Sequence, residues 1–234
     1  MNQMNPSTPE PVSPTSDASG LEHGPLTRSI HVVGSPRSGT TLLAEMLSHH
    51  GDLAYAGERR FIWRKGNDSR SDLLRAEHAR PEVRAEIRRA FERLVREAGR
   101  VRLLEKSPDN SLRLEFIDAV MPDPIYIHTV RNGLDSVLSI KSYWQRSGGR
   151  LGGINWKKRL RELTPAQAMR YAGEVVRRVR TKILPGSRAT WTWGPLLPAI
   201  TELRRELDLI DICCLQWKLC VEQACMYGRS LPAD

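Results

Sequence analysis

The sequence contains little cysteine, and its four cysteines are confined to one predicted helix near the C-terminus. Cys213 and Cys220 are separated by about two helical turns, and Cys214 and Cys225 by about three, which is too far for a disulfide within a straight helix. No Cys-x2-Cys pair occurs and no histidine lies among them, so the pattern does not indicate a zinc site. We interpret these residues as reduced, mostly buried thiols of a cytoplasmic protein.

The sequence also lacks any apolar run of about 18 residues, the length that a membrane-spanning helix requires. Its N-terminus has no apolar core of the kind found in signal peptides. We therefore predict a protein without a membrane span, located in the cytoplasm. No clustered set of metal-ligating side chains is visible, and we predict no metal cofactor.

Basic residues are in excess, since 36 Lys and Arg against 27 Asp and Glu give a formal net charge of +9. This excess suits ligands rich in phosphate or sulfate, nucleic acid or an acidic protein, and does not choose among them. The predicted helix over residues 70–99 carries many arginines, but glutamates are interleaved with them. Because such mixing is typical of a solvated helix face, we predict no nucleic-acid binding.

Two parts of the chain differ in composition. Residues 1–28 are rich in proline, serine and threonine and contain too few apolar side chains to fold, so we predict a disordered leader. Residues 29–234 are numerous enough to form one domain with a substantial core. Neither part predicts an oligomeric state.

The stretch from Ser29 to His50 organises the second part. The apolar run Ile30–Val33 predicts a buried parallel strand, which is followed by a turn with two glycines and then by leucines and a methionine at helical spacing. The first turn of such a helix has backbone N–H groups without partners, and the helix dipole adds partial positive charge there. Hydroxyls and an arginine in the turn add further donors. The stretch therefore predicts an anion-binding site.

Two further units of strand followed by helix lie downstream, over residues 101–106 with 111–120 and residues 125–130 with 134–144. We predict a P-loop-like α/β fold with three layers, α/β/α, around a central parallel sheet. Ligands of such sheets bind at the carboxyl ends of the strands. Lys106, Arg131 and the turn over residues 34–41 are all expected at those ends.

The identity of the anion is indicated by the turn itself. Gly34 and Gly39 have the spacing of a nucleotide-binding P-loop, but no lysine follows Gly39, which disfavours a kinase or NTPase. The turn resembles instead the loop of the sulfotransferase family, with the pattern P-[KR]-S-G-T-T, and the matching residues are Pro36, Arg37, Ser38, Gly39, Thr40 and Thr41. The resemblance implies that these residues bind the 5′-phosphosulfate of PAPS (3′-phosphoadenosine 5′-phosphosulfate), with the desulfated nucleotide PAP as product.

A second segment strengthens this resemblance. Arg131 stands at a predicted strand end and Ser139 follows eight positions later, the separation at which sulfotransferases bind the 3′-phosphate of PAPS. An arginine and a hydroxyl beside a helix N-terminus are well suited to a phosphate. One residue departs from the pattern, because many members have proline where this chain has Gly133.

A third segment contributes the residues that the resemblance makes catalytic. A lysine at the position of Lys106 stabilises the sulfuryl group and the leaving phosphate oxygen in the family. Cytosolic small-molecule sulfotransferases carry a histidine base where this chain has Pro108. Glu58, after Gly57, is similar instead to the base of tyrosylprotein-type and related bacterial sulfotransferases. The resemblance thus implies in-line transfer to a hydroxyl, with Glu58 as base and Arg37 and Lys106 stabilising the transferring and leaving groups.

The resemblance covers residues 29–228 and leaves the acceptor open, since a small molecule, a carbohydrate or a protein tyrosine would each supply the hydroxyl. Members usually continue into another strand and a nucleotide-binding loop, so we expect this sulfotransferase-like domain to lack its last strand and C-terminal loop. Two alternatives remain: an inactive truncated fragment that still binds PAP, and a P-loop kinase or NTPase.

Overall fold

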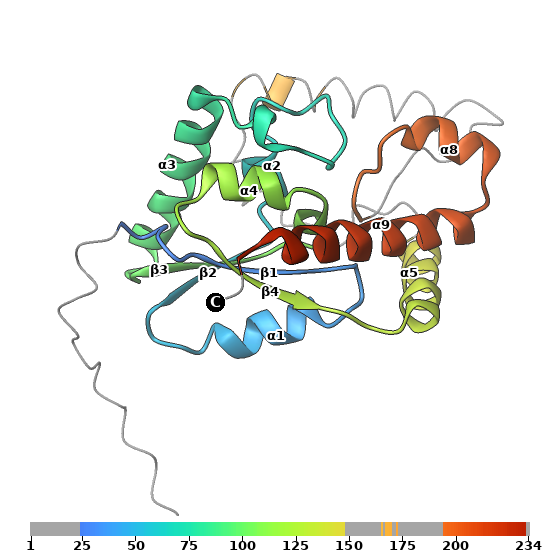
Figure 1. Ribbon diagram of the computed structural model, residues 1–234, viewed down its shortest axis with the longest axis horizontal. Helices are drawn as coiled ribbons and strands as arrows, with labels where there is room; N and C mark the ends of the chain where they lie inside the picture. The colour runs from blue at the N-terminus through green and yellow to red at the C-terminus, as the bar shows by residue number, and fades with distance from the viewer. Residues whose placement is uncertain (1–23, 148–164, 166, 170–171, 173–193, 233–234) are drawn as a thin grey trace, which may run out of the picture.

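The computed structural model describes residues 24–147, 165, 167–169, 172 and 194–232. Its centre is a parallel sheet with the strand order β2-β3-β1-β4 (Figure 1). The strands are β1 (Ile30–Gly34), β2 (Leu53–Gly57), β3 (Arg102–Lys106) and β4 (Ile125–Thr129). Within the described part of the chain, β2 and β4 form the two edges of this sheet. The predicted α/β fold with a central parallel sheet is confirmed.

Helices of very different length connect and cover these strands. They are α1 (Thr40–Leu47), α2 (Arg60–Trp63), α3 (Pro81–Glu97), α4 (Leu114–Val120), α5 (Gly133–Ser147), α8 (Ile200–Glu206) and α9 (Leu209–Ser230), with the 3-10 turns η2 (Ala76–His78) and η3 (Pro108–Leu112). Among the residues that the structure describes, no helix is both long and apolar enough to span a membrane.

The sheet separates two hydrophobic cores, because successive residues of a strand point to opposite faces. Val32 and Leu104 are buried on one face together with Ala44 of α1. Val33 and Leu103 are buried on the other face, among side chains of α3 and α4. Figure 1 shows α1 on one side of the sheet, and α3, α4 and α9 on the other. The predicted three-layer arrangement is therefore confirmed.

Two predicted boundaries are wrong. The helix predicted over residues 70–99 is confined to α3, which begins at Pro81 and is preceded by the short turn η2. Proline is favoured in the first turn of a helix, where its missing N–H has no partner to lose. The predicted leader ends earlier than residue 28, because Leu26 is buried and the N–H of Leu103 donates to the carbonyl oxygen of Pro25 at 3.3 Å. The rest of the predicted leader, residues 1–23, lies outside the described residues.

Candidate active site

The turn after β1 is attached closely to two other elements. A Cβ atom on Gly34 would lie 2.5 Å from the carbonyl oxygen of Thr129 and 2.7 Å from Oγ of Ser38, so only glycine fits there. The N–H of Gly34 donates to Oγ of Ser111 in η3 at 2.8 Å. Ser38 and Thr129 share a hydrogen bond of 2.9 Å between their hydroxyls. The carboxyl ends of β1 and β4 and the turn η3 therefore meet at the start of this loop.

The loop leads into α1, whose first N–H groups make no hydrogen bond to a capping side chain. Gly39 is the N-cap residue, in the left-handed region with φ of 97°, and it provides no side-chain cap. The first turn of α1 contains no acidic side chain. Thr40 is buried and Thr41 is exposed. The partial positive charge of the helix N-terminus is thus uncompensated from within the helix, as an anion site requires.

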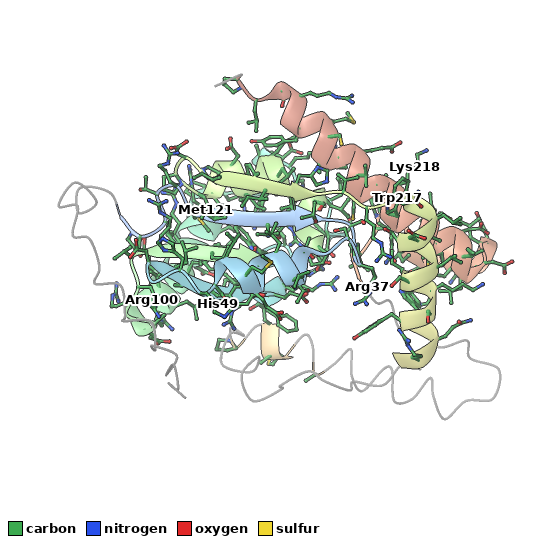
Figure 2. All side chains as sticks on the ribbon, turned by 90° about the horizontal axis from the view of Figure 1, so that it is seen from below. Arg37, His49, Arg100, Met121, Trp217 and Lys218 are labelled. Carbon is green, nitrogen blue, oxygen red and sulfur yellow. The ribbon has the colours of Figure 1, made fainter. Side chains whose placement is uncertain are left out.

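Arg37 joins the loop to the second predicted segment. Its guanidinium Nε donates to Oγ of Ser139 on α5 at 3.1 Å, and its Cζ lies 5.7 Å from the ring centroid of Tyr143. Arg131 donates from Nη1 to the carbonyl oxygen of Arg37 at 3.3 Å. Figure 2 shows Arg37 between the end of the sheet and α5. Arg37, Arg131 and Ser139 are therefore brought together at one corner, although the loop and α5 are far apart in the sequence.

Glu58 and Lys106 form an ion pair at the ends of two neighbouring strands. Nζ of Lys106 lies 2.5 Å from Oε1 of Glu58, and the Lys106 side chain is only 4% exposed against 46% for Glu58. The parallel register places Lys106 opposite Val32, two residues before Gly34. The lysine is thus sheltered at the carboxyl end of the sheet, and the glutamate reaches solvent.

A buried ionic cluster lies behind this pair, and sequence reasoning did not predict it. Asp72 accepts from Arg60 and from Arg64 at 2.7 Å each, and Nη2 of Arg113 lies 3.2 Å from it. Nε of Arg60 also lies 3.3 Å from Asp109. The only signal in the sequence is position, since Arg60 follows Glu58 by two residues and Asp109 follows Lys106 by three.

Burial and the neighbouring arginines shift the pKa values of the two carboxyl groups in this cluster. Burial by itself would raise the pKa of Asp72, but Arg60, Arg113 and Arg64 lower that pKa to about 2. Burial raises the pKa of Asp109, and Arg60 only partly opposes this effect. Asp72 also exchanges backbone and side-chain hydrogen bonds with Leu196, at 2.7 and 2.6 Å, and so fixes the segment after Gly194 beside the site.

A second buried polar group supports the turn that contains Lys106. Glu105 accepts from Oγ of Ser107 at 2.6 Å and from Nδ2 of Asn110 at 2.5 Å. Nδ1 of His31 lies 3.7 Å from the same carboxylate, and all four side chains are buried. Hydrogen bonds between buried groups are strengthened by the low local dielectric and hold the groups that make them in place. The backbone around Lys106 is therefore well fixed, and no group of three or more potential metal ligands occurs among the described residues.

Comparison with known proteins assigns the family. The sequence model of the sulfotransferase family matches residues 29–186, and the chain belongs to this family. An uncharacterized protein of Aquifex aeolicus (strain VF5) is 26% identical over 213 residues, which cover 83% of this chain. The chain spans only 26% of the length of that relative.

Two solved structures are also similar, and both are sulfotransferase domains. The domain from the Synechococcus PCC 7002 olefin synthase is 18% identical, with 91% of this chain and 98% of that domain covered and a TM-score of 0.38. The domain from the curacin biosynthetic pathway is 17% identical, with 88% and 99% covered and a TM-score of 0.39. Because both TM-scores are below 0.5, the family assignment does not depend on them.

Proposed function

We propose that this protein transfers a sulfuryl group from PAPS to an acceptor hydroxyl. The observation that carries the proposal is the meeting of Arg37, Arg131 and Ser139 at one corner of the sheet, next to the uncapped N-terminus of α1. A helix N-terminus with unpaired N–H donors, next to two arginines and a hydroxyl, suits a nucleotide that has an anionic group at each end. In this proposal Pro36–Thr41 bind the 5′-phosphosulfate, and Arg131 with Ser139 binds the 3′-phosphate.

Glu58 and Lys106 supply the chemistry in this proposal. Sulfuryl transfer resembles phosphoryl transfer, in which the protein contributes mainly position and charge. Lys106 and Arg37 stabilise the negative charge that develops on the oxygen bridging sulfate and phosphate. Glu58 accepts the proton of the acceptor hydroxyl as the new S–O bond forms and the bond to the phosphate oxygen breaks.

In this proposal the ion pair between Lys106 and Glu58 links donor binding to the basicity of Glu58. In the free protein Lys106 and Glu58 neutralise each other at 2.5 Å. When Lys106 turns to the transferring group, Glu58 loses its counter-ion and becomes available as a base. The acceptor is then a hydroxyl of a small molecule, a carbohydrate or a protein tyrosine, and protein cations neutralise the charge without a metal.

Transfer of ³⁵S from labelled PAPS to a panel of hydroxyl acceptors tests the proposal directly. We expect Lys106→Ala, Arg37→Ala and Glu58→Gln each to lower kcat by about 10²-fold or more. The matched control is Lys218→Ala, which removes a lysine from the exposed pair with Glu222 on α9. Full activity in any of the three variants would refute the role given to that residue.

Calorimetry separates the alternatives. Binding of PAP without any transfer would make the chain a nucleotide-binding fragment. Binding of ATP with Mg²⁺ in preference to PAP would favour a P-loop kinase or NTPase instead. We expect PAP to bind and ATP with Mg²⁺ to bind much more weakly, because no lysine follows Gly39.

A further inference from the structure

The N-terminus of α5 is in unusually close contact with an aromatic side chain of α9. A Cβ atom on Gly133 would lie 2.9 Å from Cζ2 and Cη2 of Trp217, and 3.1 Å from Cζ3. Gly133 is not among the glycines in the left-handed region of backbone conformation. The backbone conformation would therefore accept another residue at position 133, and the nearest atoms that a Cβ would meet all belong to the indole ring.

Trp217 stands where the two helices pack against each other. Val137 and Ile140 of α5 are buried with Cys213 of α9, and Trp217 packs against this group. The indole Nε1 is buried and has no hydrogen-bond partner among the described residues, so packing alone determines the position of the ring. Figure 2 shows Trp217 at the junction of α9 with the N-terminal part of α5.

A different side of α5 contacts the phosphate loop. Ser139 accepts from Arg37 at 3.1 Å, and Tyr143, one helical turn later, lies under the same guanidinium. Arg131 precedes Gly133 by two residues and donates to the loop carbonyl of Arg37. Because α5 is a continuous helix over Gly133–Ser147, any movement of its first turn also moves Ser139 relative to the loop.

We propose that Gly133 and Trp217 are positioning residues for the donor site. Together they set the distance between α5, whose Ser139 binds the 3′-phosphate, and the loop that binds the 5′-phosphosulfate. This inference rests on the proposed function. The Cβ of any other residue at position 133 would lie 2.9 Å from ring carbons of Trp217, and ordinary contact begins at 3.4 Å. The first turn of α5 and the ring must therefore move apart to accommodate a side chain. Such a displacement also shifts the Ser139 hydroxyl relative to Arg131 and to Arg37, with which it now makes a hydrogen bond of 3.1 Å.

The same contact restricts position 133 together with position 217. A Cβ of any residue at position 133 would meet the indole ring of Trp217. Glycine at this position and tryptophan in α9 are therefore linked, so that a change in one alone harms the site and a change in both restores it.

Calorimetry with two nucleotides tests the inference. PAP and adenosine 5′-monophosphate differ only in the 3′-phosphate. The Kd of adenosine 5′-monophosphate divided by the Kd of PAP therefore measures the preference for the 3′-phosphate. We expect Gly133→Ala to lower this ratio by about tenfold, equivalent to about 1.4 kcal/mol.

The double variant Gly133→Ala with Trp217→Leu has room for the new methyl group, and most of the preference for PAP should return. Gly228→Ala, whose Cβ meets nothing on the same helix α9, is the matched control and should leave the ratio unchanged.

The outcomes distinguish this inference from the proposed function. If the unaltered protein does not prefer PAP, the proposed function fails, and this inference fails with it. If it prefers PAP and Gly133→Ala keeps that preference, or the double variant is no better than the single one, only the inference is overturned. If Gly133→Ala does not fold, the ratio is measured in Trp217→Leu alone. Loss of the ring should lower the ratio by about threefold. An unchanged ratio in folded Trp217→Leu protein would then overturn it.

Discussion

Replacement of Asp72 by asparagine should destabilise the protein far more than an ordinary loss of an ion pair. The carboxylate lies among Arg60, Arg64 and Arg113, at 2.7, 2.7 and 3.2 Å, and it is fully buried. Removal of one partner from a buried ion pair costs about 3 to 5 kcal/mol, because charge is left uncompensated. Asp109 remains near Arg60 and Arg113, at 3.3 and 3.7 Å, so we expect the lower part of this range.

Urea unfolding followed by circular dichroism measures this loss, and the chain offers a matched control. The pair of Arg75 with Glu115 has the same distance of 2.7 Å, but its side chains are 40% and 42% exposed. Exposed pairs contribute about 0 to 1 kcal/mol, so Glu115→Gln should change the free energy of unfolding by no more than this. If Asp72→Asn and Glu115→Gln cost the same, burial does not govern the strength of these pairs and the reasoning fails.

The pH dependence of this difference has a definite sign. The pKa of Asp72 is lowered from 3.8 to about 2 in the folded protein, so its charge contributes stability above the ordinary value, and this stability is lost as the pH falls through about 2. The lowering is worth about 2 kcal/mol. The advantage of the unaltered protein over Asp72→Asn should therefore shrink by about that amount between pH 5 and pH 2, and a constant difference would contradict the assignment.

Two further predictions concern glycine and cysteine. Gly34→Ala should weaken PAP binding by about tenfold or more in calorimetry, because the new methyl group would lie 2.5 Å from the carbonyl oxygen of Thr129, and unchanged affinity would contradict this contact. Thiol reagents followed by mass spectrometry should modify exposed Cys214 first in the folded protein. Cys213, whose pKa burial raises to about 11, and Cys220, whose pKa burial also raises, should react only on unfolding, and equal rates for all three would refute their burial.

The loop and its helix could be predicted because the information is local. The run from Ile30 to Thr41 contains a strand, a turn and the start of a helix in contiguous residues, and the glycines and hydroxyls of the proposed anion site occur within it. The apolar patterns of the other strands implied a parallel sheet. A parallel sheet brings the carboxyl ends of its strands to one edge, so the sequence alone was enough to expect Lys106 and Arg131 near the loop.

Other features depended on which side chains meet across the fold. The ion pair of Glu58 with Lys106 joins residues 48 apart in the sequence, and the contact of Arg37 with Ser139 joins residues 102 apart. The role of Asp72 could not be inferred, because its three arginine partners come from α2, from the loop that follows it and from the residue between η3 and α4.

The sequence by itself determined the α/β class of the fold, the strand, turn and helix around residues 30–47, and the family, because short contiguous patterns specify each of these. Only the tertiary structure decided which charges are buried together and why position 133 must be glycine. Those outcomes depend on how close two helices approach and how much water is excluded between them, and neither quantity is a property of any one segment.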